Sequence, residues 1–446
     1  MEVTLKEILD AREARAQHQK TLLAKYNKPL VSFTMNIPGP VKLDRDVSIG
    51  FFVGCRLLRD ALAGRLLYAE EHQKETGCEA FFVADLPARE LKELTVELED
   101  GDSVGRLFDM DVLDVDGRAI SREELGYPRR GCLICTEDAV VCARSRAHSV
   151  QELRDRTDFL LYLAARQHMA EYIAVRAYLA LLQEVKTTPK PGLVDRRNSG
   201  AHKDMDMRHF FASANALRPF FCRFAEQGYL TRDIDPVETF ARIRSIGMEA
   251  EEAMYAATHG VNTHKGAIFT MGLLCAACGR LGPDKWQTEN ILAEIAAMAA
   301  GVVKKDFADI TKENAKTPGE HLYAAYGITG IRGQAEKGFP AIKDVGLPIL
   351  KEGLKKGLSL NDAGAVTLLH LLAVTEDTNI IHRTDVGTYE SVRLEMKALL
   401  QSTPFPSLDA IEALDDDFIH KGSSRRSHPC KKERRPQRTR AHPSVS

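Results

Sequence analysis

The sequence lacks the features that mark membrane, secreted or fibrous proteins. No apolar run approaches the roughly 18 residues that a membrane-spanning helix requires, and the N-terminal segment has no apolar core followed by a small-residue cleavage site. The nine cysteines are odd in number and unevenly spaced, which favours reduced thiols in the cytoplasm over a disulfide framework. We therefore expect a cytoplasmic protein without a membrane anchor, and its 446 residues predict two or three globular domains.

An excess of positive charge is found only near the C-terminus. The formal net charge is −2, but residues 421–446 carry nine Lys or Arg against one Glu, which leaves the rest of the chain acidic. Because phosphate contacts need a positive surface, we do not expect a nucleic-acid partner. A non-enzymatic interaction protein whose basic tail binds nucleic acid is the competing interpretation. Residues 423–446 lack Leu, Ile, Phe and periodicity, so we expect them to be disordered.

The rest of the chain shows two patterns in succession. Three short runs bounded by Pro, Gly or Asp read as strands, namely Leu30–Ile37, Ala80–Ala84 and Val104–Val115. From about residue 150 the apolar spacing is helical, as in Gln151–Lys186 and Thr239–Ala257. The predicted fold class is multidomain, with an α+β N-terminal domain followed by a larger all-α C-terminal domain. The predicted limits are 1–155 and 165–422.

Two carboxylates lie two residues apart on the last predicted strand. Side chains alternate across a strand, so Asp109 and Asp111 share one face while Phe108 and Met110 take the other. Such a pair can hold Mg²⁺ and leave coordination positions for substrate phosphates. The alternative is a solvated strand face.

Further candidates surround this pair. Asn36 and Lys42 flank a rigid Pro-Gly-Pro turn and could contact a phosphate, as could Arg106, although a plain strand-ending turn is equally compatible. Four soft ligands follow, and they could close a tetrahedral zinc site: Cys132, Cys135, Cys142 and His148. Their spacing is looser than in standard zinc ribbons, and it favours reduced structural thiols.

Three polar clusters punctuate the helical region. The first is a loop with Lys190, Asp195, His202, Lys203, Asp204 and Asp206, although Asp206 could simply cap the next helix. The second opens a helix with Asn262, Thr263, His264 and Lys265, a suitable cradle for a triphosphate. On the preceding helix Glu249 and Glu251 flank the apolar stripe, while Glu252 points roughly opposite, and periodicity does not choose which flanking glutamate reaches a metal. The third cluster contains Asp377, Asn379 and Arg383.

These clusters carry a specific resemblance. KPGLVDRRNSGAHKDMD, EAEEAMYAATHGVNTHKGAIF and EDTNIIHR resemble the signature blocks of the triphosphoribosyl-dephospho-CoA synthase family. NIPGPVK, GRLFDMDVLD and CLIC…CARSRAH are similar to segments of apo-citrate lyase phosphoribosyl-dephospho-CoA transferase, a nucleotidyltransferase-type enzyme. Together the two resemblances span about 420 residues, and they imply a bifunctional fusion of consecutive enzymes.

The resemblance implies two reactions. ATP and 3′-dephospho-CoA would give 2′-(5″-triphosphoribosyl)-3′-dephospho-CoA and adenine. The phosphoribosyl-dephospho-CoA group would then pass to a serine of the citrate lyase acyl carrier protein, the gamma subunit, with release of pyrophosphate. The alternative within this chemistry is the prosthetic group of malonate decarboxylase, but the N-terminal motifs look like the citrate lyase type.

On this basis we assign roles to the candidates. The catalytic set is Asp109, Asp111, Asp204, Asp206, Glu251 and His264, and the four aspartates would hold Mg²⁺. The substrate-binding set is Asn36, Lys42, Arg106, Lys190, Asp195, His202, Asn262, Thr263, Lys265, Asp377, Asn379 and Arg383. The chain departs from the family pattern after LDDDFIHKG, where a Pro-Gly-Gly-Ser-Ala-Asp-Leu-Leu-like ending is missing. We therefore expect the synthase activity to be much weaker than the transferase activity.

Overall fold

The computed structural model describes residues 2–424 except 201, 203, 376–380 and 382–385. These residues form two compact units. The first unit combines Met1–Gln183 with His209–Lys343, and the second combines Glu184–Arg208 with the chain from Asp344 onward. Each unit is described by itself below.

The first unit begins with a five-stranded antiparallel sheet in the order β2-β3-β1-β4-β5. The strands are β1 (Leu30–Met35), β2 (Leu66–Lys74), β3 (Gly77–Ala84), β4 (Phe108–Leu113) and β5 (Ala119–Ile120). The first two predicted strands are confirmed as β1 and β3. The third is correct only from Phe108, because Val104–Leu107 forms a short 3₁₀ helix, η1. There a Cβ on Gly105 would lie 2.4 Å from the carbonyl oxygen of Leu98, so this backbone packs against the preceding helix instead of extending the strand.

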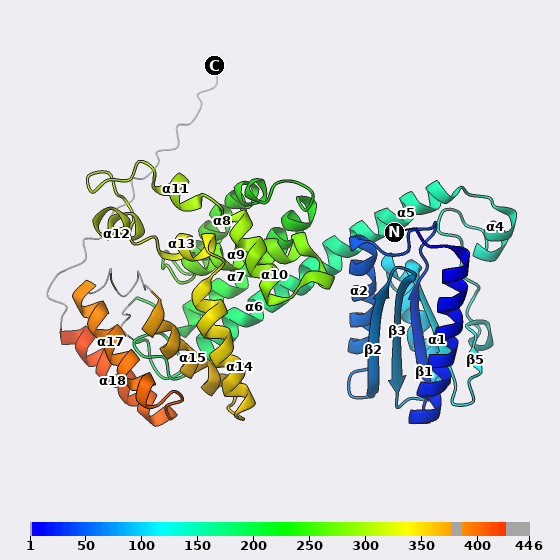
Figure 1. Ribbon diagram of the computed structural model, residues 1–446, viewed down its shortest axis with the longest axis horizontal. Helices are drawn as coiled ribbons and strands as arrows, with labels where there is room; N and C mark the ends of the chain where they lie inside the picture. The colour runs from blue at the N-terminus through cyan, green and yellow to red at the C-terminus, as the bar shows by residue number, and fades with distance from the viewer. Residues whose placement is uncertain (1, 201, 203, 376–380, 382–385, 425–446) are drawn as a thin grey trace, which may run out of the picture. The chain divides into compact units, whose positions relative to one another are not determined.

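Helices cover both faces of this sheet (Figure 1). On one face lies α1 (Leu5–Tyr26), whose Leu22 and Leu23 pack on Phe81 and Val83. The other face packs against α2 (Arg45–Ala61), α3 (Ala88–Asp100) and α5 (Val150–Ala164). Its core includes Val31, Phe33, Phe82, Phe108 and Met110. Alternation along each strand therefore divides the sheet residues between two apolar layers.

The remainder of the first unit is helical, as predicted. The predicted helix Gln151–Lys186 is α5 continued by a π-helical turn, η3 (Ala165–Met169), and by α6 (Ala170–Lys186), while Thr239–Ala257 lies within α8 (Pro236–Ala257). The other helical elements are η2 (Glu123–Leu125), α4 (Ala139–Ser145), α7 (Met207–Leu230), α9 (Lys265–Leu281), η4 (Pro283–Lys285), α10 (Thr288–Met298), α11 (Val302–Phe307), α12 (Pro318–Tyr326), α13 (Gly330–Glu336) and η5 (Ile342–Gly346).

Two glycines bring α7 and α9 into backbone contact. A Cβ on Gly228 would lie 2.1 Å from the carbonyl oxygen of Ala276, and one on Gly279 would lie 2.1 Å from that of Ala225. No other residue fits at either position without separating the helices. This close crossing fixes α9, the helix that follows the second polar cluster.

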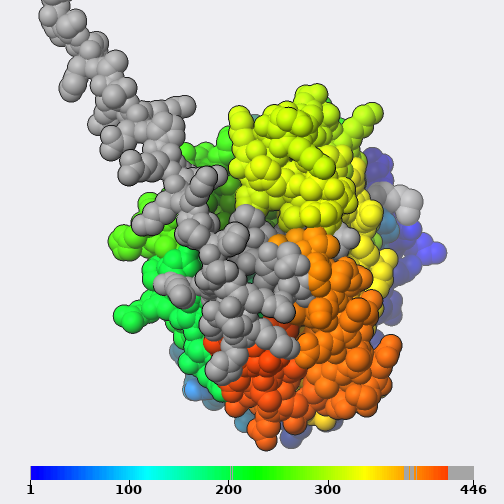
Figure 2. Space-filling view, turned by 90° about the vertical axis from the view of Figure 1, so that its left-hand side faces the viewer, coloured from blue at the N-terminus to red at the C-terminus, as the bar shows by residue number. Residues whose placement is uncertain are grey.

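The second unit is a smaller helical assembly. Its helices are α14 (Leu347–Lys355), α15 (Leu360–Val374), α17 (Val386–Ser402) and α18 (Leu408–Ser424). Val366, Leu369, Met396, Leu400 and Ile411 form its core. Figure 2 shows α17 and α18 as adjoining orange and red surfaces. The loop between α6 and α7 belongs to this unit.

The structure confirms part of the predicted fold class. A small antiparallel sheet near the N-terminus followed by helices agrees with the predicted succession. The domain limits 1–155 and 165–422 stay a prediction. The predicted tail begins within the last two residues of α18, and its residues 425–446 lie outside the described part of the chain. Among the described residues, no helix combines the length and the apolar character needed to cross a membrane.

Candidate active sites

The carboxylate pair lies on β4, as predicted. Asp109 and Asp111 are exposed, and they alternate with the buried Phe108, Met110 and Val112. Both point to the face of the sheet that α1 covers, where β1 places Thr34 opposite Asp109. The hydroxyl of Thr34 donates a hydrogen bond to Asp109 Oδ2 at 3.4 Å. The predicted sharing of one face is therefore confirmed.

The surroundings of Asp111 disfavour its ionised form. Loss of hydration at the sheet surface raises its pKa first of all, and the negative charge of Asp109 adds to this effect. Lys92 and Arg15 act in the opposite direction. Arg15 comes from α1, where Gln19 one turn later donates to Ser32 on the sheet at 2.8 Å. A cation or a positively charged neighbour would thus stabilise the ionised pair.

The same face continues into polar residues that sequence reasoning missed. On β2, Glu70 accepts hydrogen bonds from the Tyr68 hydroxyl at 2.6 Å and from His18 of α1 at 3.0 Å, and it also contacts His72. These bonds, the one from Tyr68 above all, lower the pKa of Glu70 to about 2. On β3, Glu79 is paired with Lys74. Glu70, His72 and Lys74 are each two positions apart in the sequence. This spacing could have predicted that they share one face of a strand.

The three predicted phosphate contacts near the pair have different surroundings. Asn36 is exposed at the end of β1, and its backbone N–H donates to Leu107 O at 2.8 Å. Lys42 donates to Ile37 O at 2.5 Å, and burial, followed by the charges of Arg12 and Arg154, lowers its pKa. Arg106 donates to Gly131 O at 2.6 Å. Lys42 and Arg106 therefore already bond to backbone carbonyls.

The cysteine cluster is assembled in space. Ligand atoms of Cys132, Cys135, Cys142 and His148 all lie within 4.8 Å of one another. Burial would raise the pKa of the Cys132 thiol, but hydrogen bonds from the backbone N–H groups of Cys135 and Ile134 bring it to about 7. Within the described ranges, no other group of three or more His, Cys, Asp or Glu side chains is close enough to share an ion. A metal at Asp109 and Asp111 would thus need substrate oxygens to complete its coordination.

The second polar cluster lies at the turn between α8 and α9, where the candidates come together. Lys265 forms an ion pair with Glu251 at 3.0 Å, and its backbone N–H donates to Asn262 Oδ1 at 3.2 Å. His264 is buried, with Nδ1 2.7 Å from the hydroxyl of Ser213. The hydroxyl of Thr263 is buried, and among the described residues it has no hydrogen-bond partner. The N-terminus of α9 is therefore lined with polar groups, as predicted.

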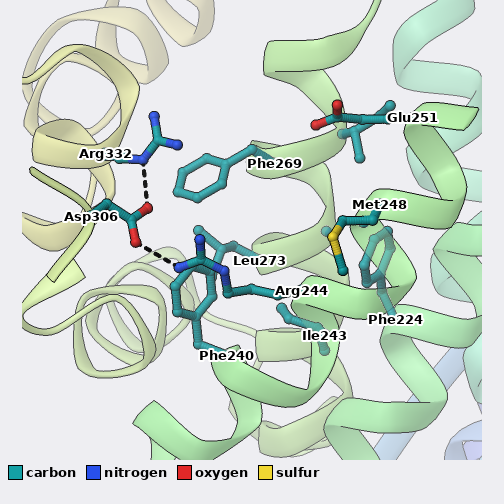
Figure 3. A pocket seen from close by; sticks show the side chains of 13 residues that line it. Phe224, Phe240, Ile243, Arg244, Met248, Glu251, Phe269, Leu273, Asp306 and Arg332 are labelled. Atoms are coloured by element: carbon teal, nitrogen blue, oxygen red, sulfur yellow. Dashed lines mark hydrogen bonds and ion pairs between the residues drawn. The ribbon is translucent and has the colours of Figure 1, made fainter. Parts of the chain in front are cut away.

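A cavity of about 190 Å³ adjoins this turn (Figure 3). Its walls include Phe240 and Phe269, and Glu251 lies at one end. At the other end Asp306 accepts hydrogen bonds from Arg244 at 2.7 Å and from Arg332 at 2.8 Å. Burial opposes ionisation of Asp306, but these two guanidinium groups lower its pKa. The arrangement offers a largely apolar space with charged groups at both ends.

This cavity distinguishes Glu251 from Glu249, the two flanking glutamates between which periodicity did not choose. Glu251 is half-buried and lines the cavity. Glu249 is exposed and paired with Arg223 at 2.7 Å, and Glu252 is exposed as well. Among the three, Glu251 is therefore the one placed to meet a ligand in this cavity.

In the second unit, the residues of the first polar cluster mainly shape their own loop. Lys190 is buried, and its ammonium group donates to Glu184 O at 3.0 Å and to Glu184 Oε1 at 2.6 Å. Asp195 is buried and accepts hydrogen bonds from three backbone N–H groups, those of Lys190, Arg197 and Asn198. These bonds hold the loop in one conformation, whatever further role the two side chains have.

The other members of this loop are more open to solvent. Asp204 is exposed and His202 is half-buried. Asp206 directly precedes α7 and accepts the backbone N–H of Arg208 at 2.9 Å, so the capping alternative is realised in the structure. Lys203, Asp377, Asn379 and Arg383 lie outside the described residues.

Sequence reasoning missed Asp415, the strongest anchor of this loop. Asp415 is fully buried on α18, and it accepts hydrogen bonds from Gly192 N at 2.9 Å, Asn198 Nδ2 at 2.7 Å and Arg197 Nη1 at 3.0 Å. The sequence does contain an indication of this role. Asp415 lies one helical turn after the buried Ile411, where the apolar stripe of α18 predicts a hydrophobic residue.

Replacing Asp415 by alanine should therefore release the loop. The substitution leaves the half-buried Gly192 N–H without its acceptor, which typically costs enough to lower Tm by roughly 5 °C in a domain of this size. We also expect at least a tenfold loss of any activity that depends on the loop. Differential scanning calorimetry and an activity assay would measure both effects. The exposed Asp409→Ala on the same helix is the control, and equal behaviour of the two variants would contradict this role.

The first unit thus presents a sheet face with paired carboxylates and nearby cations, and a helical pocket with aromatic walls and charged ends. Carboxylates that can hold a metal beside cations that can meet phosphates suit phosphorylated nucleotides. They define a transferase that acts on nucleotides. The chain belongs to the family of ATP:dephospho-CoA triphosphoribosyl transferases, whose family model matches residues 170–427. The model of apo-citrate lyase phosphoribosyl-dephospho-CoA transferases matches residues 3–162.

Three relatives match large parts of this chain. The protein CitXG of Haemophilus influenzae is 36% identical over 391 residues, which cover 85% of this chain and 83% of the relative. The protein CitXG of Leuconostoc mesenteroides subsp. cremoris is 33% identical over 86% of this chain and 85% of its own length. The 2-(5″-triphosphoribosyl)-3′-dephosphocoenzyme-A synthase of Haemophilus ducreyi is 36% identical over 65% of this chain and 94% of its own length.

Proposed function

We propose that this chain makes the prosthetic group of citrate lyase and attaches it to the acyl carrier protein of that enzyme. The observation that carries the proposal is the succession of two family matches on one chain, the transferase at residues 3–162 and the synthase at residues 170–427. The product of the second region is the substrate of the first. The proposal implies a cytoplasmic protein, because ATP and dephospho-CoA are cytoplasmic metabolites.

For the synthase step, we infer that the 2′-hydroxyl of dephospho-CoA attacks C1 of the ATP ribose and that adenine leaves. Positive charge develops on the ribose, as in glycoside chemistry, so a carboxylate beside it stabilises the transition state. Glu251 is the candidate for this role, because it lines the cavity and is held by Lys265. His264 and Lys265 are the candidates for contacts to the phosphates or to the leaving base.

The cavity beside Glu251 suits one end of a substrate. Its volume of about 190 Å³ is below the roughly 300–1,000 Å³ of pockets that enclose a drug-sized ligand. Phe240 and Phe269 pack edge to face with ring centroids 6.0 Å apart, and a purine base can pack against this aromatic wall. We propose that adenine occupies this cavity while the phosphates extend toward the N-terminus of α9.

For the transfer step, we infer that a serine of the acyl carrier protein attacks the phosphate next to the ribose and that pyrophosphate leaves. Asp109 and Asp111 would hold Mg²⁺, which suits two carboxylate ligands and would supply neutralisation of the phosphate charge. Arg15, whose charge acts on Asp111, is a candidate for contacts to the same phosphates. Asp204 and Asp206 remain assigned to Mg²⁺ in the synthase step from the sequence alone.

Two assays test the proposal. Incubation with ATP and dephospho-CoA should release free adenine, which chromatography separates from ADP and AMP. Addition of the citrate lyase carrier subunit should then increase its mass by that of the phosphoribosyl-dephospho-CoA group. Formation of ADP or AMP without adenine would contradict the synthase assignment. The two rates also test the expectation that the synthase is the weaker activity.

The same assays separate the alternatives. A malonate decarboxylase pathway predicts modification of that enzyme's carrier instead, whereas the N-terminal match favours the citrate lyase carrier. A nucleic-acid-binding tail predicts an affinity that falls steeply with salt and that disappears when residues 421–446 are removed.

A further inference from the structure

The segment between β5 and α5 is ordered with almost no hydrophobic core. From Tyr127 to Ser149, only Cys142 is a buried side chain. The apolar side chains of Val140 and Val141 are exposed, and Leu133 is only partly buried against the sheet. Burial of so little apolar surface does not offset the conformational entropy of a segment of this length. A cross-link must therefore contribute to its order.

The fold of the segment brings four ligand atoms to one point. A bridge between Gly131 and Asp138 and a hydrogen bond from Cys132 N to Glu137 O at 2.7 Å close a hairpin that carries Cys132 and Cys135. Asp138 then caps α4, which presents Cys142. His148 follows just before α5 begins. Three different local structures thus contribute to the cluster.

The distances within the cluster are close to those of tetrahedral coordination. Cys135 Sγ lies 3.4 Å from Cys142 Sγ and 3.3 Å from His148 Nε2, and all four ligand atoms lie within 4.8 Å of one another. Zinc bonds of about 2.3 Å to sulfur and 2.0 Å to nitrogen require ligand atoms separated by roughly 3.5–3.8 Å. In addition, the backbone N–H of Ile134 points to Cys132 Sγ at 3.4 Å, a contact that favours a thiolate.

A disulfide explains the cluster less well than a metal. The 3.4 Å between the sulfur atoms of Cys135 and Cys142 exceeds the S–S bond length of about 2.05 Å. A disulfide would also give no reason for the third cysteine and the histidine to converge on the same point. Three thiolates and one imidazole form a closed ligand set that is typical of structural zinc.

The segment is tied to the candidate active site by two arginines. Arg106 donates to the carbonyl oxygens of Gly131 and Cys132. Arg130 donates to Phe108 O at 2.6 Å and to Arg106 O at 3.0 Å. The hairpin that carries two of the ligands therefore holds the start of β4, one residue before Asp109.

We propose that Cys132, Cys135, Cys142 and His148 bind one structural zinc ion, which orders the hairpin and thereby positions the Asp109 and Asp111 pair. The zinc site stands on the geometry of the cluster. Its positioning role rests on the proposed transferase function. The sequence spacing favoured reduced thiols without a metal, and this proposal replaces that interpretation.

Metal analysis of the full-length protein tests the site independently of activity. Plasma mass spectrometry of protein produced with zinc should find one zinc per chain, and Co²⁺ substitution should give the absorption bands of a tetrahedral thiolate site. Cys135→Ser and His148→Ala should lose the metal, whereas His148→Cys should keep it because the set becomes four cysteines. Cys222→Ser, at a half-buried thiol outside the cluster, should retain one zinc.

The outcomes separate the two parts of the proposal. Zinc-free protein with a Cys135–Cys142 disulfide, or full zinc content in Cys135→Ser, would overturn the site. Removal of zinc by chelation, followed by removal of the chelator and return of Mg²⁺ alone, should increase cleavage by trypsin at Arg144 and Arg146. It should also reduce transfer to the carrier at least tenfold without reducing adenine release. Unchanged transfer after complete removal of zinc would overturn the positioning role. Absence of transfer by the zinc-loaded protein would contradict the transferase function, but it would not contradict the zinc site, which the metal content tests separately.

Discussion

Replacing both Asp109 and Asp111 by asparagine should reduce transfer to the carrier protein by a factor of about 10³ or more. The amide groups keep the shape of the carboxylates but lose the negative charge that holds a divalent cation at the phosphate. Both side chains are exposed on β4, so the sheet core beneath them is unaffected. The increase in mass of the carrier subunit, followed over time, measures the effect.

The pattern across variants identifies the cause. Adenine release should be unchanged in the double variant, because β4 takes no part in the proposed synthase chemistry. Asp10→Asn, an exposed carboxylate on α1, is the matched control and should transfer at the wild-type rate. Transfer at the full rate by the double variant would show that these carboxylates do not hold a catalytic metal.

The second large effect is expected at Glu251. Glu251→Gln should lower adenine release about 10²–10³-fold, because a neutral amide cannot stabilise positive charge that develops on the ribose. The change also removes the ion pair with Lys265, so binding of ATP should be altered to a smaller extent than turnover. Chromatographic assay of adenine at saturating ATP measures the loss of turnover.

The neighbouring glutamate provides the control for this variant. Glu249→Gln removes a carboxylate from the same helix, but that carboxylate is exposed and paired with Arg223 away from the cavity. We expect near-normal adenine release from Glu249→Gln and normal carrier transfer from both variants. If the two glutamine variants lose adenine release equally, the cavity is not the site of the reaction.

Much of the local structure could be predicted because it depends on periodicity. Alternation along residues 108–112 correctly placed Asp109 and Asp111 on one face, since a strand offers a side chain only two sides. The apolar spacing of Thr239–Ala257 correctly predicted a helix, now part of α8. Val104–Leu107 was misassigned because Gly105 packs closely against Leu98 and Glu99 at the end of α3, and the residue pattern of the segment does not show this packing.

The candidate sites were predictable only as lists of residue types. The spacing of Cys132, Cys135, Cys142 and His148 favoured separate thiols, yet the hairpin and α4 bring them together. Their convergence depends on the turn at residues 131–138, whose closing hydrogen bonds are invisible in the spacing. Similarly, the sequence shows that Asp415 lies on the apolar side of the α18 helix, but it does not show which residues of the loop Asp415 binds.

The sequence by itself determined the order of sheet and helices, the shared face of the carboxylate pair and the family to which the chain belongs. These properties depend on neighbouring residues or on motifs. Only the tertiary structure decided which glutamate meets the cavity, because Glu249 and Glu251 are nearly equivalent along α8 and differ only in what packs beside them. It also decided that α1 supplies Arg15 and His18 to the sheet face, since such contacts join residues that are distant in the chain and close only after packing.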